Sequence, residues 1–305
     1  MNRSNAAHIG KTPTTHASPT TPSLASQHSV VRSPGHGAAL ADTTHHSKSY
    51  VYVAHSRRAG GLSLGIDLTP QGFCSFRCIY CQASHPPVRN PDISVDVATL
   101  VKDLRERLQA ETGDLKDLVF AGSGEPTAVP NFAAAIDAVE QVCRAHNFDR
   151  PRRIFSNARH LHRDEVWTAL DGWCERGGEL WIKFDGATDN AVERVNGRRF
   201  SVSEHLQRVW RFASHRPIGL QTMLLRGPSL APPQQMLEQL VQALTPAIRD
   251  GARIVQWHLL TISRRPADDQ MARELAPVEL DELQRLASDA AQATGLVVQV
   301  YPCAG

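Results

Sequence analysis

Three cysteines, Cys74, Cys78 and Cys81, lie within eight residues in the run CSFRCIYC. Thiolates at this spacing can bind three corners of a cubane iron–sulfur cluster, which usually has four cysteine ligands. The other three cysteines are scattered along the chain, and none of them is close to this run. The spacing therefore predicts a cluster with one iron free of protein ligands, and an open coordination position is what distinguishes a catalytic metal site from a structural one.

Two other interpretations use the same cysteines. A structural zinc site could combine the three thiolates with His85, four residues after Cys81, since zinc commonly takes Cys3His ligand sets. The segment CIYC by itself could be a redox-active dithiol of the C-x-x-C kind. We favour the cluster, and the content of iron and inorganic sulfide separates it from both alternatives.

A second motif, GSGEPT, occupies residues 122–127 and directly follows an apolar segment. Gly122 and Gly124 allow the backbone on either side of Ser123 to approach a ligand closely, and Glu125 adds a carboxylate. Exposed backbone N–H and C=O groups in such a turn can bind the polar ends of an amino acid. The structural alternative is a tight turn that begins a helix.

Further polar residues lie at or near the ends of apolar segments. Lys183 and Asp185 close one segment, where the lysine is a candidate for binding substrate or cofactor, or for forming a Schiff base with a carbonyl substrate. The structural alternative is a pair that satisfies its own charges. Asn157 and Gln221 could hydrogen-bond a nucleoside or a substrate, or be satisfied polar groups of the core.

These residues need elements to position them, and the chain alternates strand and helix patterns. Short apolar runs predict strands at 63–68, 118–121, 153–156, 180–185, 218–224, 254–260 and 296–301. Apolar residues at three-to-four spacing predict helices at 96–111, 132–146, 164–174, 202–213, 236–248 and 280–293. This alternation predicts an α/β fold with a parallel sheet and helical crossovers.

Six strand–helix units favour a partial (β/α)6 TIM-like barrel over a full barrel of eight units, with a doubly wound open sheet as the alternative. Within 180–185, the period of two predicts that Trp181, Lys183 and Asp185 face the barrel interior and that the residues between them face the helices. The cysteine run and GSGEPT both follow predicted strands, at the end of the barrel where catalytic residues are found.

Residues 1–48 are rich in Ser, Thr, Ala, Pro and His and show no periodicity, so we expect a disordered N-terminal tail before a single domain at 49–305. The chain has 305 residues and a net charge of +2, which is not the strongly basic composition of a general nucleic-acid-binding protein. No apolar run is long enough to span a membrane, and no secretory signal opens the chain. Clustered, unpaired cysteines indicate a cytoplasmic, reducing location.

Taken together, the cysteine run with Tyr80 before its last cysteine resembles the signature of the radical S-adenosylmethionine superfamily. Blocks such as FAGSGEPT at 120–127 and WIKFDG at 181–186 resemble a branch related to the wyosine-base tRNA-modifying enzymes. This resemblance implies a [4Fe–4S] cluster whose free iron holds the amino and carboxylate groups of S-adenosylmethionine. An electron from the cluster then splits the sulfonium and yields a 5′-deoxyadenosyl radical.

The resemblance also assigns roles to residues. It implies that the three cysteines hold the cluster, that residues 122–125 position the methionine end of S-adenosylmethionine, and that Tyr80 packs near the cluster or adenine. Asn157 and Gln221 are weaker candidates for the nucleoside, and Lys183 and Asp185 for substrate or cofactor. Because the reaction begins with electron entry, a flavodoxin- or ferredoxin-like donor is implied.

The substrate is not identified by these motifs. Arginines occur in pairs at 57/58, 152/153, 198/199 and 264/265, which suggests an anionic substrate such as an RNA or a nucleotide. No cysteine precedes Cys74, whereas archaeal wyosine-forming enzymes bind a second cluster through upstream cysteines, so the resemblance supports radical chemistry more than that particular reaction. Activation of a glycyl-radical partner, modification of a peptide, and a non-enzymatic Cys3His zinc module are the alternatives.

Overall fold

An eight-stranded sheet organises the chain, and its strands lie in the order in which they occur in the sequence. The computed structural model describes residues 49–83, 93–111 and 113–303, so the predicted tail at 1–48 lies outside it. The strands are β1 (Val51–Ser56), β2 (Gly61–Ile66), β3 (Leu115–Phe120), β4 (Arg152–Ser156), β5 (Glu179–Lys183), β6 (Ile218–Met223), β7 (Ile254–Leu260) and β8 (Val298–Tyr301). The helices are α1 (Val97–Ala110), the 3-10 turn η1 (Pro126–Ala128), α2 (Phe132–Ala145), α3 (Asp164–Glu175), α4 (Asp189–Asn196), α5 (Val202–His215), α6 (Pro233–Arg249), α7 (Asp269–Glu274) and α8 (Leu280–Thr294).

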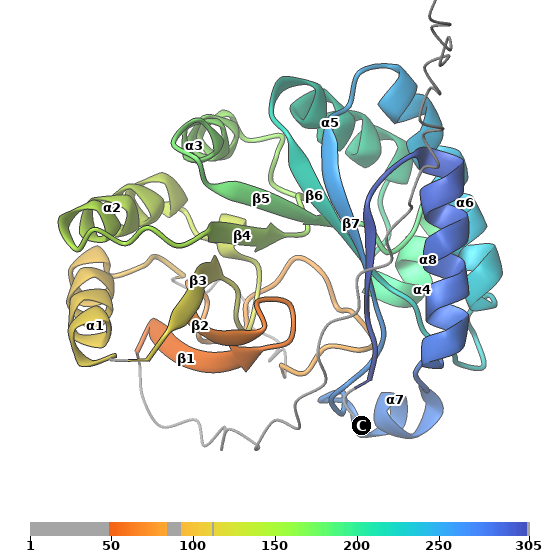
Figure 1. Ribbon diagram of the computed structural model, residues 1–305, viewed down its shortest axis with the longest axis horizontal. Coiled ribbons are helices and arrows are strands. Elements are labelled where there is room, and N and C mark those ends of the chain that lie inside the picture. Colours follow the sequence, from red (N-terminus) through yellow and green to blue (C-terminus); the bar gives the residue numbers. More distant parts are fainter. Residues whose placement is uncertain (1–48, 84–92, 112, 304–305) are drawn as a thin grey trace, which may run out of the picture.

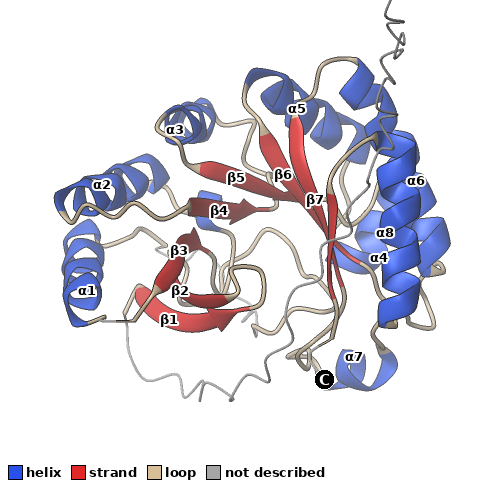
Figure 2. Cartoon of the chain, in the orientation of Figure 1, coloured by secondary structure: helices blue, strands red, loops and turns tan. Residues whose placement is uncertain are grey.

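Strands β2 to β8 are parallel, and β1 is an antiparallel edge strand that forms a hairpin with β2. The six predicted strand–helix units are present, because α1, α2, α3, α5, α6 and α8 each lead from one parallel strand to the next. A doubly wound sheet reverses its strand order partway, so the linear order excludes that alternative. The sheet curls into a half-barrel with the helices on its outer side, which confirms the predicted fold class (Figures 1 and 2).

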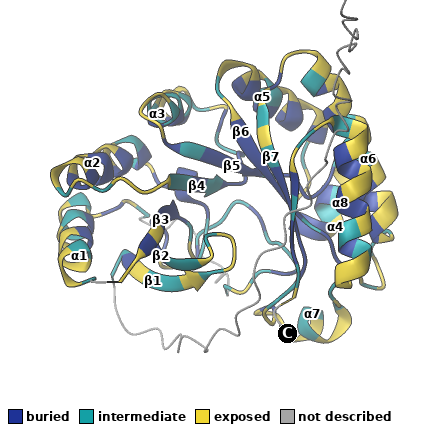
Figure 3. Ribbon diagram, viewed as in Figure 1, coloured by how far each residue is buried: buried dark blue, intermediate teal, exposed yellow. Residues whose placement is uncertain are grey.

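The outer face of the sheet and the helix faces that cover it form the hydrophobic core (Figure 3). Trp173 of α3 is fully buried and meets Phe120 of β3 edge-on, with ring centroids 5.4 Å apart. Phe184, just after β5, meets Trp210 of α5 in the same way at 5.5 Å. Burial of one such side chain contributes roughly 1.5–3 kcal/mol, so this layer holds the half-barrel together.

Local signals set where the helices begin and end. Asp96 caps α1 by accepting from the Thr99 N–H, and Thr188 caps α4 by accepting from the Ala191 N–H. Gly197 ends α4 in the left-handed conformation, with φ of 64°. The predicted elements agree with the observed ones to within a few residues, apart from an earlier start of β3 and of α6.

Three elements were not predicted: β1, α4 and α7. Strand β1 lies at the edge of the sheet, and its apolar run is confined to the four residues at 51–54. Helices α4 and α7 have eight and six residues, too few to establish a helical period. Two kinds of signal could have indicated these two helices: the polar capping residue before each helix and the glycine after α4. In the part of the chain that the structure describes, no helix is both long and apolar enough to cross a membrane.

The inner face of the half-barrel is close-packed at Gly219 of β6. A Cβ added there would lie 2.4 Å from the ring of Trp181 on the adjacent strand. We expect Gly219→Ala to lower the free energy of unfolding by about 1–3 kcal/mol, because the indole must move. Urea unfolding measures the change.

Gly172, inside α3, provides the control. An added methyl group there meets only the flexible end of Arg176, and alanine favours a helix interior by up to about 1 kcal/mol over glycine. Gly172→Ala should therefore be neutral or stabilising, and equal losses in the two variants would contradict the packing at Gly219.

Candidate functional site

The cysteine loop follows β2, at the end of the half-barrel where the parallel strands terminate. Its backbone is fixed by α4, because the Arg77 and Ile79 N–H groups donate to the carbonyl oxygens of Asn196 and Val195 at 2.7 and 3.0 Å. Gly197 is required at the end of α4, since a Cβ there would lie 2.5 Å from the Arg77 carbonyl oxygen. Helix α4, which was not predicted from the sequence, therefore holds the backbone of the cysteine loop in place.

Hydrogen-bond donors surround the partly buried cysteine sulfurs. The Phe76 N–H donates to Cys74 Sγ at 3.4 Å, and the Asn157 amide approaches the same sulfur at 3.8 Å. The Asn196 amide donates to Cys78 Sγ at 3.3 Å. Such donors stabilise thiolate ligands and help to set the reduction potential of a cluster.

The pKa values of Cys74 and Cys78 indicate that metal binding must displace a proton from each thiol. Burial raises the pKa of Cys74 to about 12, and burial also raises the pKa of Cys78. Both therefore keep their protons at neutral pH until a metal displaces them, which couples ligation to proton release.

Among the described residues, no three His, Cys, Asp or Glu side chains gather around one point as the ligands of a single metal ion do. In a cubane, each thiolate binds a different iron, so the three sulfurs need not converge. His85, the fourth ligand of the alternative zinc site, lies outside the described residues. One loop that carries three thiols and receives N–H donors is chemically suited to an iron–sulfur cluster.

The GSGEPT loop follows β3 and packs directly on the cysteine loop. The Ser123 N–H donates to Asp67 at 2.8 Å, and the Glu125 N–H donates to the Phe73 carbonyl oxygen at 3.0 Å. A Cβ on Gly124 would lie 2.0 Å from that carbonyl oxygen, so only glycine permits this approach. The structure thus brings together two predicted motifs that are separated by about 45 residues in the sequence.

Glu125 is buried and joins the loops that follow β3 and β4. Its carboxylate accepts from Ser156 Oγ at 2.6 Å, from the Asn157 N–H at 2.8 Å and from the Thr127 N–H at 3.2 Å. Burial raises its pKa, and these hydrogen bonds oppose the increase. Both carboxylate oxygens already have protein partners, and the bonds hold Asn157 beside Cys74.

Tyr80, Lys183 and Asp185 form one buried cluster. The Tyr80 hydroxyl donates to Asp185, Lys183 donates to the Tyr80 oxygen, and the Lys183 ammonium lies 3.3 Å from Asp185. Burial lowers the pKa of Lys183, but Asp185 and Cys78 raise it by more, so the net change is upward. A charged ammonium donates hydrogen bonds but cannot attack a carbonyl, which favours a binding role over Schiff-base formation.

Gln221 lies on β6, in register with Lys183 on β5 and His258 on β7. It is buried, and its side-chain Nε2 has no hydrogen-bond partner among the described residues. Because an unpaired buried donor costs about 1–3 kcal/mol, this amide is suited to a ligand.

Two functional candidates were missed at the sequence level. Asn196 donates both to Cys78 and to Asp185, the latter at 2.9 Å, and the Asn–Gly pair that ends α4 was its only signal. Asp67, at the end of β2, receives the Thr69 N–H at 2.9 Å in addition to that of Ser123. Its position immediately after a strand could have indicated it.

The eight arginines of the four pairs have three kinds of environment in the structure. Four arginines form ion pairs with carboxylates of the protein: Arg152, Arg153, Arg199 and Arg265. Arg198 donates to the Ser75 carbonyl oxygen in the cysteine loop at 2.9 Å. Three others line a cavity inside the half-barrel: Arg57, Arg58 and Arg264.

The fold and site define an α/β half-barrel protein with a three-cysteine loop at the ends of its parallel strands. The family model described as the radical SAM superfamily matches residues 68–240, which is more than half of the chain. The chain belongs to this superfamily, as its cysteine loop and GSGEPT motif predict, and it is an enzyme of that family.

Curated relatives match shorter stretches. A UPF0026 protein of Synechocystis sp. is 26% identical over 137 residues, which cover 45% of this chain and 48% of the relative. A UPF0026 protein of Methanocaldococcus jannaschii is 30% identical over 36% of this chain and 33% of its own. A protein named GTPase Obg of Brachyspira hyodysenteriae is 32% identical over 38% of this chain and 16% of its own. The chain spans less than half the length of each.

Two solved structures are similar to this chain to different degrees. Spore photoproduct lyase complexed with dinucleoside spore photoproduct has a TM-score of 0.55 at 11% identity, covering 83% of this chain and 79% of the lyase, so the lyase shares the fold. TYW1 with a lysine–pyruvate adduct has a TM-score of 0.48 at 15% identity, covering 75% of this chain and 73% of its own. At 11% identity the similarity to the lyase is one of fold and does not extend to substrate.

The Lys183–Asp185 pair, which joins a buried carboxylate to an ammonium on a partly exposed side chain, makes a thermodynamic prediction. We expect Asp185→Leu to lower the free energy of unfolding by about 3–5 kcal/mol, because it leaves a largely buried ammonium without its counter-charge. Adding Lys183→Met should restore part of the loss, and urea unfolding of the two variants measures both steps.

Glu193→Gln is the control, because Glu193 pairs with the exposed Arg199. An exposed ion pair contributes at most about 1 kcal/mol. If Glu193→Gln and Asp185→Leu cost the same, or if the second substitution restores nothing, Asp185 does not act through the lysine charge.

Proposed function

We propose that residues 49–305 form the catalytic domain of a radical S-adenosylmethionine enzyme that holds a [4Fe–4S] cluster through Cys74, Cys78 and Cys81. The observation that carries this proposal is the packing of the cysteine loop on residues 122–125, with amide donors aimed at its sulfurs. Three thiolates leave one iron for S-adenosylmethionine, which when bound supplies the 5′-deoxyadenosyl radical chemistry of the superfamily.

The protein's own residues bind and orient the reactants. Gly122, Ser123 and Gly124 offer backbone groups to the methionine end of S-adenosylmethionine. The Glu125 carboxylate fixes that loop through its hydrogen bonds to Ser156 and Asn157. Tyr80, Asn157 and Gln221 bind on the nucleoside side. Lys183 and Asp185 hold Tyr80 beside the cysteines, and the Lys183 ammonium, balanced by Asp185, is a hydrogen-bond donor to the substrate.

The substrate we propose is anionic, and an RNA or a nucleotide is the class that fits best. Support comes from Arg57, Arg58 and Arg264, which line the interior cavity. Electron entry requires a low-potential donor of the flavodoxin or ferredoxin kind, and clustered cysteines that form no disulfide bond are consistent with a cytoplasmic location.

The cysteine assignment makes a direct prediction. After anaerobic reconstitution, the unaltered protein should hold about four irons and four sulfides per chain. It should also release 5′-deoxyadenosine from S-adenosylmethionine when dithionite is added. Cys78→Ala should lose the cluster and this release, because two thiolates cannot retain a cubane.

Cys143→Ala and Cys174→Ala are matched controls, because these cysteines lie on α2 and α3 outside the site. Both should keep the iron, the sulfide and the release of deoxyadenosine. A colourless protein that binds zinc instead, or a cluster-loaded protein that cleaves no S-adenosylmethionine, would refute the proposal.

A further inference from the structure

A cavity of about 890 Å³ lies inside the half-barrel. The interior of a closed TIM barrel is filled by branched apolar side chains, whereas here the inward positions carry charged, aromatic and polar residues. The cavity reaches Gln82, which follows Cys81, and Met223, whose N–H binds Asp185. It therefore adjoins the cysteine loop and has the volume of a small-molecule site.

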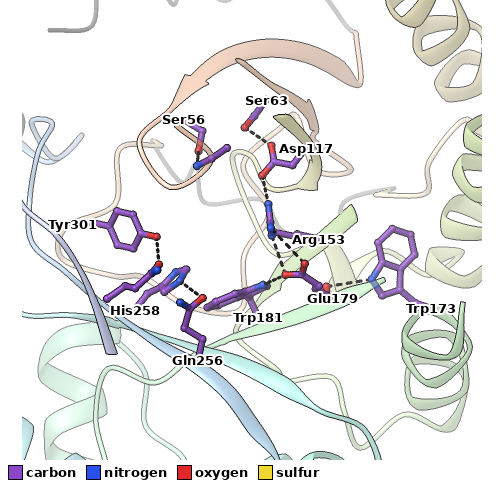
Figure 4. A network of polar contacts seen from close by, with 12 residues as sticks. Ser56, Ser63, Asp117, Arg153, Trp173, Glu179, Trp181, Gln256, His258 and Tyr301 are labelled. Carbon is purple, nitrogen blue, oxygen red and sulfur yellow. Dashed lines mark hydrogen bonds and ion pairs between the residues drawn. The ribbon is translucent and has the colours of Figure 1, made fainter. Parts of the chain in front are cut away.

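The charged side chains at the floor of this cavity form ion pairs and hydrogen bonds with one another (Figure 4). Arg153 pairs with Asp117 and with Glu179, the latter at 2.9 Å, and Ser63 donates to Asp117. Glu179 also accepts from the Trp181 indole N–H at 2.8 Å. Both carboxylates that line the cavity are thus held by Arg153, and with Arg57, Arg58 and Arg264 the lining carries four positive and two negative groups, an excess of two positive charges.

Arg58 has no such partner. Within the described residues, no carboxylate lies at ion-pair distance from its guanidinium, which sits 4.3 Å from the centre of the Phe155 ring. Its surface remains open to the cavity although protein atoms surround it, and burial lowers its pKa to about 10, so it is still charged at neutral pH. An exposed guanidinium that faces the cavity without an ion-pair partner among the described residues can bind an anion through charge-assisted hydrogen bonds.

Two more guanidinium groups line the same cavity. Arg57 donates to the Pro302 carbonyl oxygen, which joins the β1–β2 hairpin to the end of β8. Burial lowers the pKa of Arg57, and repulsion from Arg264 lowers it further, so the two cations are close enough to interact. Three positive groups gathered at one side of the cavity suit a phosphate, which carries a charge of about −2, better than a single carboxylate.

One wall of the cavity is aromatic. Trp181 lies between Phe155 and His258, with ring centroids 6.2 and 4.0 Å away, and Tyr301 follows His258 at 4.8 Å (Figure 4). The Trp181 ring is held by Glu179 at its indole N–H and lies directly over Gly219. Only 3–5% of Trp181, His258 and Tyr301 is exposed, so the cavity reaches the edges of these rings, against which a planar ring can pack.

His258 adds a specific polar contact. Its Nε2 lies 3.0 Å from the Gln256 amide oxygen, which can only accept, so Nε2 carries the proton. The Nδ1 atom is then an acceptor, and it has no partner among the described residues although only 5% of His258 is exposed. A ligand with a ring N–H would satisfy it.

We infer that this cavity binds a phosphorylated planar heterocycle as the substrate of the radical reaction. The phosphate lies against Arg58, the ring packs against the edge of the Trp181–His258 wall, and a ring N–H donates to His258 Nδ1. That the bound ligand is a substrate rests on the proposed function, whereas its binding to the cavity can be tested separately.

The test uses equilibrium dialysis with the anaerobically reconstituted protein and four probes: UMP, GMP, uridine and guanosine. Each nucleotide should bind at least tenfold more tightly than its nucleoside, because a charge-assisted hydrogen bond contributes about 1.5–3 kcal/mol. Arg58→Gln should remove most of this difference and reduce the loss of UMP affinity with added salt.

Arg265→Gln is the matched control, because Arg265 neighbours Arg264 but is exposed and pairs with Asp269 at 2.6 Å. It should bind UMP as the unaltered protein does. Iron content and melting temperature check that Arg58→Gln folds. A comparison that needs no variant uses UMP methylated at N3, which should bind more weakly than UMP because it cannot donate to His258.

Equal affinity for nucleotides and nucleosides, an equal loss in Arg265→Gln, or binding of indole-3-acetate as tight as that of UMP would overturn the inference. The deoxyadenosine assay is independent of these measurements. If nucleotides bind but S-adenosylmethionine is not cleaved, the proposed function fails and the binding site stands. If cleavage occurs without nucleotide binding, the inference fails and the function stands.

Discussion

The Asp185 carboxylate is buried, and a buried charge persists only where donors surround it. Tyr80 from the cysteine loop, Asn196 from α4 and the Met223 N–H from β6 all donate to it, and Lys183 supplies a counter-charge. No two of these four groups are adjacent in the sequence. The position of the cysteine loop over the strand ends therefore depends on satisfying this one carboxylate.

Glu125 has the corresponding role on the other side of the loop. Its carboxylate fixes Asn157, while its N–H binds the Phe73 carbonyl oxygen one residue before Cys74. The loop is thus held between two buried carboxylates, one on the β3 side and one on the β5 side. This arrangement gives rigid, preorganised support to a flexible sequence of polar and cysteine residues, as a site that must orient reactants requires.

The interior of the half-barrel is lined by charged and polar side chains, whereas its outer face is apolar. Outside, the apolar side chains of the strands are covered by helices and supply the stability of the fold. Inside, Arg153 pairs with both Asp117 and Glu179, which holds the floor in place, and Arg57, Arg58 and Arg264 bring the charge of the cavity lining to four positive and two negative groups. Among the described residues, Arg57, Arg58 and Arg264 line the cavity without an ion-pair partner, and Arg58 faces the same space as the aromatic wall. The positive charge of the cavity therefore comes from the turn of the β1–β2 hairpin and from the segment that follows β7.

Much of the fold could be predicted because it depends on neighbours along the chain. The period of two in 180–185 correctly assigned which side chains face the helices, and the alternation of strands and helices predicted the half-barrel. The edge strand β1 could have been found from its four apolar residues at 51–54, whereas the short helix α4 has too few residues to establish a period. The pairing of Arg152 and Arg153 with carboxylates was also beyond the sequence, because their partners lie on other elements.

The amino-acid sequence by itself determined the chemistry that the chain offers: three thiols at cluster spacing, a glycine-rich turn with a carboxylate, and the superfamily to which they belong. These features are local, so spacing alone reveals them. Only the tertiary structure decided that Asn196 reaches Cys78 across 118 residues, and that Arg58 rather than Arg152 faces the cavity. Such contacts depend on strand register and on helical crossovers, which bring distant residues together only when the half-barrel has formed.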